Sequence, residues 1–127
     1  MRKMCLAVVL FLTLLCVSGV LMPEANANRS SEYFHGKYFY DNGSSSQFEG
    51  ILYRQNTKIW GECTDQDGSK STISGNTDGD SINFIKTYNN DNHRVQYSGR
   101  YYSDTNTIKG NWRTSQNNIG SFYMTMD

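Results

Sequence analysis

Apolar and polar residues alternate along the chain beyond residue 32, in short stretches separated by polar breaks. Alternation with a period of two places successive side chains on opposite faces of a β-strand. Asn42-Gly43, Asp67-Gly68 and Asp78-Gly79 are dipeptides typical of tight hairpin turns, and looser polar breaks supply the other connections. The pattern predicts eight strands, over residues 33–40, 47–54, 58–65, 69–77, 81–88, 94–102, 107–114 and 119–126.

Within these stretches an apolar residue is often followed, two positions later, by glycine and then by a second apolar residue. The clearest copies are Phe34-x-Gly36-x-Tyr38, Phe48-x-Gly50-x-Leu52, Ile59-x-Gly61-x-Cys63, Tyr97-x-Gly99-x-Tyr101 and Ile108-x-Gly110-x-Trp112. All three positions of each copy share one face of a strand, and that face is the predicted core. The stretch 81–88 lacks the glycine but keeps the alternation, which turns Lys86 inward as well, near a rim.

The inward glycines determine the predicted architecture. Glycine weakens a strand interior, but it lets a sheet bend sharply and leaves room for large neighbours such as Tyr97 and Trp112. Short connections favour antiparallel pairing of consecutive strands. We therefore predict an all-β fold, an eight-stranded antiparallel up-and-down β-barrel or a strongly coiled meander. A hollow and a filled interior are both open at this point.

The N-terminal segment has the pattern of a secretory signal peptide. Arg2 and Lys3 precede a long apolar run, and Ala25-Asn26-Ala27 provides a small-x-small cleavage site. We predict a signal peptide at 1–27, a single barrel domain at 28–127, a secreted or periplasmic location and no membrane span in the mature chain. Sequons at Asn28 and Asn42 match glycosylation acceptors, which matter only in a eukaryotic host.

Composition narrows the class of protein. Beyond residue 27 the chain contains no alanine and no proline, while aromatic residues make up 13% of the full sequence. This bias favours strands over helices and is too aromatic for a disordered chain. The formal net charge is +0, and it becomes −1 once Arg2, Lys3 and Glu24 are removed. A near-neutral domain excludes nucleic-acid binding by bulk electrostatics.

No pattern for catalysis, a metal or a cofactor is visible. His35 and His93 lie outside any metal-ligand or catalytic spacing, and no serine has the surroundings of a nucleophile. Asp65-Gln66-Asp67-Gly68 resembles a calcium loop superficially, but its glycine comes too early and no glutamate follows. Cys63 is the one cysteine left after signal removal, and its inward position predicts a buried, unreactive thiol. We expect a protein that is not an enzyme.

Aromatic residues supply the candidate sites. One set faces inward and could line a ligand site: Phe84, Tyr88, Tyr97, Tyr101 and Trp112. Buried Tyr and Trp need partners for their O–H and N–H groups, which favours positions that a ligand or water can reach. A second set faces outward and could form an interaction face: Phe39, Ile51, Tyr53, Trp60 and Ile85. Outward apolar groups that cluster are typical of an interface.

The stretch from Val95 to Trp112 resembles the penultimate hairpin of avidin-like barrels. It reads Val-Gln-Tyr-Ser-Gly-Arg-Tyr and, after a turn, Ile-Lys-Gly-Asn-Trp. The resemblance implies a barrel and marks Trp112 as the counterpart of a pocket aromatic of that family. The opening Gly-x-Trp of the family is here Gly36-Lys37-Tyr38, so the resemblance implies the barrel rather than biotin as the ligand. The glycine pattern also resembles small uncharacterised β-meander domains.

The leading functional hypothesis is a secreted, non-catalytic protein that holds a small apolar or aromatic ligand in the barrel. The alternative is a secreted interaction module, an inhibitor or effector, that contacts a protein partner through its outer aromatic face. A pocket of about 300 Å³ or more that opens to solvent favours the first hypothesis.

Overall fold

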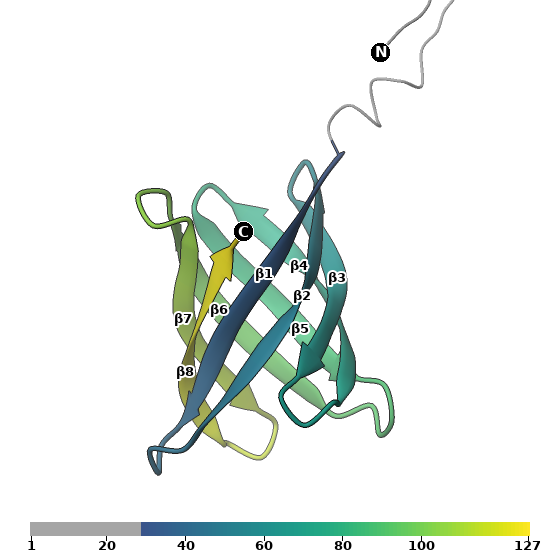
Figure 1. Ribbon diagram of the computed structural model, residues 1–127, viewed down its shortest axis with the longest axis vertical. Helices are drawn as coiled ribbons and strands as arrows, with labels where there is room; N and C mark the ends of the chain where they lie inside the picture. The colour runs from purple at the N-terminus through teal and green to yellow at the C-terminus, as the bar shows by residue number, and fades with distance from the viewer. Residues whose placement is uncertain (1–28) are drawn as a thin grey trace, which may run out of the picture.

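A computed structural model describes residues 29–127, which form a closed, antiparallel, eight-stranded barrel (Figure 1). The strands are β1 (Arg29–Tyr40), β2 (Ser45–Gln55), β3 (Lys58–Asp65), β4 (Lys70–Asp78), β5 (Ser81–Tyr88), β6 (Arg94–Tyr102), β7 (Thr107–Thr114) and β8 (Ile119–Met126). Each strand pairs with the next, and β8 pairs back with β1 from Phe34 opposite Met126 to Tyr40 opposite Gly120. The predicted up-and-down barrel is confirmed in its closed form. The predicted signal peptide lies outside the described residues.

Five of the predicted strands, β3 and β5 to β8, begin and end where the sequence pattern places them. The largest difference is at β1, which begins at Arg29 because its first residues pair with the end of β2, where Arg29 faces Gln55. This pairing adds Gln55 to the end of β2, and pairing with Tyr38 and Phe39 adds Ser46 and Ser45 to its start. The alternation of side chains is unaffected, so every strand keeps its predicted inward face.

The connections between strands share one backbone feature, a residue with positive φ. Glycine provides it in the three turns with Asn-Gly or Asp-Gly dipeptides, at Gly43, Gly68 and Gly79. Asparagine provides it in the four looser breaks, at Asn56, Asn92, Asn106 and Asn117. Asparagine tolerates this left-handed conformation better than other residues with a Cβ atom. Part of the high asparagine content is therefore turn chemistry.

The barrel has two unlike ends. The lower end in Figure 1 carries the turns at 41–44, 66–69, 89–93 and 115–118. The upper end carries the turns at 56–57, 79–80 and 103–106, together with the first and last described residues. Since strands alternate in direction, residues near the end of β1, β3, β5 and β7 all approach the lower end.

Aromatic rings fill the middle of the barrel. The rings of Phe84 and Tyr97 are stacked with centroids 4.8 Å apart, and Phe122 meets the edge of Tyr97 at 4.9 Å. Aliphatic and sulfur-containing side chains pack around them. The buried apolar residues are Phe34, Tyr38, Phe48, Ile59, Cys63, Ile73, Ile82, Phe84, Val95, Tyr97, Ile108, Trp112, Phe122, Met124 and Met126. The middle of the barrel is thus filled by side chains.

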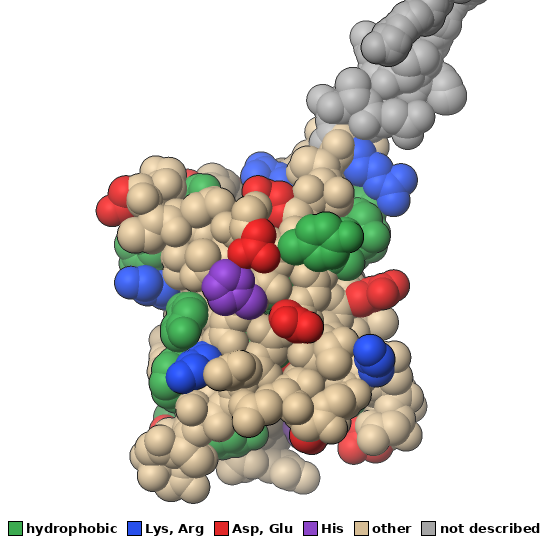
Figure 2. All heavy atoms as spheres, in the orientation of Figure 1, with side chains coloured by type: hydrophobic (Ala, Val, Ile, Leu, Met, Phe, Trp, Pro, Cys, Tyr) green, Lys and Arg blue, Asp and Glu red, His purple; other side chains and the backbone are tan. Residues whose placement is uncertain are grey.

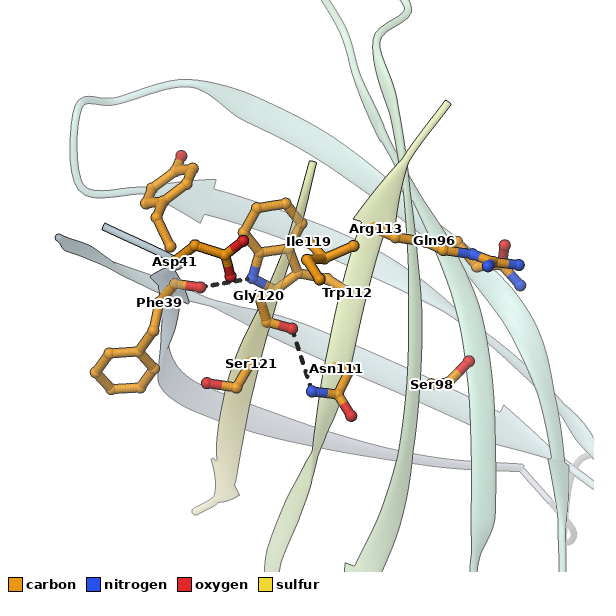
Figure 3. A pocket seen from close by; sticks show the side chains of 11 residues that line it. Phe39, Asp41, Gln96, Ser98, Asn111, Trp112, Arg113, Ile119, Gly120 and Ser121 are labelled. Carbon is orange, nitrogen blue, oxygen red and sulfur yellow. Dashed lines mark hydrogen bonds between the residues drawn. The ribbon is translucent and has the colours of Figure 1, made fainter. Parts of the chain in front are cut away.

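Trp112 and Gly120 close the barrel wall near the lower end (Figure 3). The indole crosses Gly120 on the neighbouring strand and donates a hydrogen bond from Nε1 to the Phe39 carbonyl oxygen at 3.1 Å. A Cβ atom at Gly120 would overlap that oxygen and lie 2.5 Å from Cε2 and Cζ2 of Trp112. Here the expected use of an inward glycine, to make room for a large neighbour, is seen directly.

Candidate ligand site at the lower end of the barrel

A buried ion pair forms the floor of the lower end. Lys86 of β5 donates from Nζ to Oδ1 of Asp65 at the end of β3, at 2.6 Å. The Lys86 residue is 0% exposed and Asp65 is 5% exposed. Taking two charges out of water is costly unless they are paired and hydrogen-bonded, and the short contact between Lys86 and Asp65 offsets this cost. Lys86 points inward as predicted, but it is covered completely and does not reach the rim.

Two tyrosines complete the coordination of this carboxylate. The hydroxyl groups of Tyr38 and Tyr88 donate to Oδ2 of Asp65, at 2.8 and 2.5 Å. Burial raises the pKa of both phenols, and the hydrogen bonds to Asp65 raise the pKa further. Both hydroxyls therefore remain donors at neutral pH. Asp65 accepts one hydrogen bond from Tyr38 of β1, two from Lys86 and Tyr88 of β5, and a longer one from Sγ of Cys63 in β3 at 3.8 Å.

The Lys86 ammonium also lies among aromatic rings. Its Nζ is 4.9 Å from the ring centroids of Tyr38 and Tyr88, 5.0 Å from that of Phe48 and 6.0 Å from that of Tyr97. Rings at this distance attract a cation through their negative faces. The lower end thus already holds one ammonium group by combining a carboxylate with aromatic rings.

A pocket of about 380 Å³ opens at the lower end of the barrel, and the Asp65–Lys86 ion pair lies at its inner end. One wall is an edge-to-face cluster of Tyr38, Tyr40 and Trp112, in which the Tyr40 and Trp112 centroids are 5.3 Å apart. On the β5 side, the rings of Tyr88 and His93 are stacked at 6.0 Å. The remaining lining residues are mostly polar: Asp65, Asp67, Ser69, Asn90, Asp91, Val95, Tyr97, Thr114 and Asn118. A concave site with aromatic walls and a few converging polar groups is typical of small-molecule binding.

The structure brings three of the five predicted ligand-lining aromatics together. Tyr88, Tyr97 and Trp112 all line the lower-end pocket. Phe84 is 2% exposed and belongs to the central core, stacked on Tyr97. Tyr101 lies near the upper end, where its hydroxyl donates to Oδ1 of Asn106 at 2.6 Å. The five residues therefore do not line one common cavity.

The predicted interaction face also divides. Tyr53 and Trp60 stack with centroids 5.7 Å apart, Ile51 lies on the same outer face of β2, and the Arg29 guanidinium sits over both rings at 5.8 and 5.4 Å. Phe39 instead packs against Tyr123 of β8 at 6.2 Å. Ile85 is separated from Trp60 by Ser74 of β4. In Figure 2 the apolar side chains on the visible face likewise lie in separate groups.

Sequence reasoning missed Asp65 and Tyr38 as site residues. The sequence pattern places Asp65 at the end of the predicted strand 58–65, but its chemistry was considered only for a calcium loop, although it continues the inward series of Ile59, Gly61 and Cys63 in β3. Lys86 has the same inward parity in β5. Two opposite charges that both face inward near the same end of a barrel should pair, and this signal was available in the alternation.

Other chemistry is limited among residues 29–127. In this range no three His, Cys, Asp or Glu side chains group closely enough to hold a metal ion. Nor does it contain a helix with the length and apolar character needed to cross a membrane. Cys63 is free and buried, as predicted, and burial raises the pKa of its thiol to about 11. A protonated, covered thiol is a poor nucleophile.

A hollow of about 500 Å³ also lies on the outside of the wall, between Phe39, Gln96, Arg113 and Ile119 (Figure 3). Most of its lining side chains come from the outer faces of β6 to β8 and from the end of β1. Tyr40 and Trp112 line it too, and both also line the lower-end pocket. The lower-end pocket differs because its floor is a buried, fully bonded polar cluster. That difference makes the lower end the better candidate site.

The fold and the site define a class of protein: a closed β-barrel with a filled aromatic core and one open, polar and aromatic end. No protein-family model matches the sequence, and no curated protein matches it. Among solved structures, the chain is similar to a de novo designed fluorescence-activating β-barrel, with a TM-score of 0.57 and 13% sequence identity. The match covers 76% of this chain and 92% of the designed one. At this identity the similarity concerns the barrel fold alone.

Proposed function

We propose that this protein is a non-catalytic binding protein that holds a small molecule in the lower-end pocket. The observation that carries the proposal is the pocket of about 380 Å³, with aromatic walls over the Asp65–Lys86 floor. Its volume falls within the range of about 300–1,000 Å³ that small-molecule sites occupy. The similar designed barrel is fluorescence-activating, a property compatible with a bound small molecule.

The pocket refines the hypothesis drawn from the sequence. Because rings fill the centre, the ligand would enter from one end and rest on the polar floor. Tyr88 and Trp112 would contact it, joined by Tyr38 and Tyr40, while Tyr97 is 2% exposed and lies at the base of the pocket. We also propose that the protein does not catalyse a reaction. Finally, we propose that it is exported from the cell, which rests on the predicted signal peptide at 1–27.

A titration with the neutral aromatic fluorophore N-phenyl-1-naphthylamine tests the function. We expect a saturable rise in its fluorescence with one site per chain. Asn90→Trp should abolish this rise, because Asn90 lines the pocket and is exposed in the turn 89–93. Asn89→Trp is the matched control, since Asn89 is the adjacent exposed residue and faces an outer groove instead. Equal responses from the two variants would contradict the proposed site.

The interaction-module alternative retains one specific observation. Tyr33 is 67% exposed and faces Ile51, next to the stacked pair of Tyr53 and Trp60. An exposed apolar group of this kind is typical of a protein contact. The double variant Tyr53→Ser/Trp60→Ser tests it: partner binding would be lost while fluorophore binding at the lower end remained unchanged.

A further inference from the structure

We infer that the ligand of the lower-end pocket is a small organic cation, of the aromatic amine or quaternary ammonium class. This inference rests on the proposed function and adds the chemistry of the ligand. Three features of the pocket carry it: the balance of fixed charges, the faces of its rings, and the way the barrel already binds its own ammonium group.

The fixed charges of the pocket favour a cation. Within the part of the chain that the structure describes, no lysine or arginine lines it. Lys86 is part of the floor, is 0% exposed and is balanced by Asp65 at 2.6 Å. Two further carboxylates, Asp67 and Asp91, lie at the rim, and neither forms an ion pair with a basic side chain of residues 29–127. A cleft lined by one sign of charge concentrates ligands of the opposite sign.

Both rim carboxylates are fixed in position by their turns. Oδ1 of Asp67 accepts a hydrogen bond from the Ser69 amide at 2.9 Å, and Oδ1 of Asp91 accepts one from the His93 amide at 3.0 Å. Hydrogen bonds from the backbone and side chain of Ser69 lower the pKa of Asp67. Negative charge is therefore held at the entrance at neutral pH.

The aromatic walls supply the second attraction. Tyr40 and Trp112 stand on one side of the pocket and Tyr88 on the β5 side, so a ligand between them meets rings from different strands. Ring faces attract an ammonium group by about 0.5–2 kcal/mol, depending on how far it is desolvated. Lys86 shows the same recognition one layer deeper, with two of the same tyrosine rings, Tyr38 and Tyr88, at 4.9 Å.

A matched phenyl series tests the inference on the full chain, by titration calorimetry at low ionic strength. The probes are benzyltrimethylammonium, benzyl alcohol and phenylacetate, which share the ring and differ in charge. We expect the cation to bind at least about tenfold more tightly than the neutral alcohol, phenylacetate to bind most weakly, and added salt to reduce the preference.

The double variant Asp67→Asn/Asp91→Asn removes both rim charges and keeps the amide oxygens that hold the turns. It should lower the affinity for benzyltrimethylammonium by about tenfold and leave that for benzyl alcohol unchanged. Asp78→Asn/Asp80→Asn removes the same charge from exposed residues of the upper end and should leave both affinities unchanged.

The outcomes separate the two proposals. Equal binding of all three probes, or preference for phenylacetate, would overturn the cation while leaving a small-molecule site in place. If the rim and the upper-end double variants lose the same affinity for benzyltrimethylammonium, the rim carboxylates are not the reason for the preference for a cation. Failure of all three probes and of the neutral fluorophore to bind would overturn the proposed function itself.

Discussion

Replacing Gly120 with alanine is a sharp test of how the barrel is closed. The added methyl group would overlap the carbonyl oxygen of Phe39 and lie 2.5 Å from two ring carbons of Trp112. Neither neighbour can yield freely, because the carbonyl belongs to the β1 backbone and the indole is 4% exposed. The same carbonyl accepts the Nε1 hydrogen bond of Trp112, so one small substitution disturbs the packing and the hydrogen bond together.

The expected cost follows from these two contributions. Overpacking a well-filled core typically costs about 1–3 kcal/mol. Losing the indole hydrogen bond adds about 0.5–1.5 kcal/mol, since the net value of one intramolecular hydrogen bond is of that size. Gly120→Ala should therefore lower the free energy of unfolding by about 2–4 kcal/mol, a large part of the 5–15 kcal/mol typical of a small domain.

Urea unfolding followed by circular dichroism measures this change. Ser121→Ala is the control, because Ser121 is the next residue of β8 and is exposed on the outer face. The control should stay within about ±0.5 kcal/mol of the original protein. If Gly120→Ala also stays within that range, the close approach of Trp112 to the β8 backbone is not a constraint, and the reasoning about inward glycines fails.

Three further predictions concern the polar floor and its neighbours. Asp65→Asn should lower the free energy of unfolding by about 3–5 kcal/mol, because the buried Lys86 ammonium loses the charge that balances it. Lys86→Met should lower it less, because the Asp65 carboxylate keeps its two phenol donors. The urea midpoints of the two variants test this order. The pKa values of Tyr38 and Tyr88 are raised in the folded state, so the unfolded phenols ionise before the folded ones. The free energy of unfolding should therefore not depend on these two groups below pH about 10, and it should fall as the pH rises above about 10. Absorbance at 295 nm should show both phenols ionising only on unfolding. Cys63 should react with a thiol reagent at pH 8 only after denaturant is added, and rapid labelling of the native protein would contradict its burial.

Much of the fold could be predicted from local rules. Turn dipeptides and alternation place strands such as β3 and β5 correctly because a β-strand has a fixed period of two and hairpin turns need particular residues. Closure of the barrel is less local. The inward glycines indicated bending, but only the pairing of β8 with β1 shows that the bend is completed.

The site was harder to predict for a physical reason. Whether inward rings line a cavity or fill it depends on the volume enclosed by eight strands, which no single strand reveals. Phe84, Tyr97 and Phe122 together occupy the centre, and their contacts join β5, β6 and β8. Once the centre is filled, inward aromatics nearer the ends, such as Tyr88 and Tyr101, separate into different environments.

The buried ion pair explains why the two ends differ. Burying a charged pair gives little net stability compared with apolar residues of similar volume, so stability alone does not account for Asp65 and Lys86. What the pair does provide is orientation: the carboxylate fixes the hydroxyls of Tyr38 and Tyr88, and the ammonium holds their rings. A preorganised polar floor lets a ligand bind without first ordering the side chains it meets. Among the described residues the upper end lacks such a buried charged cluster, so a preorganised polar floor is a feature of the lower end, where we propose that the ligand binds.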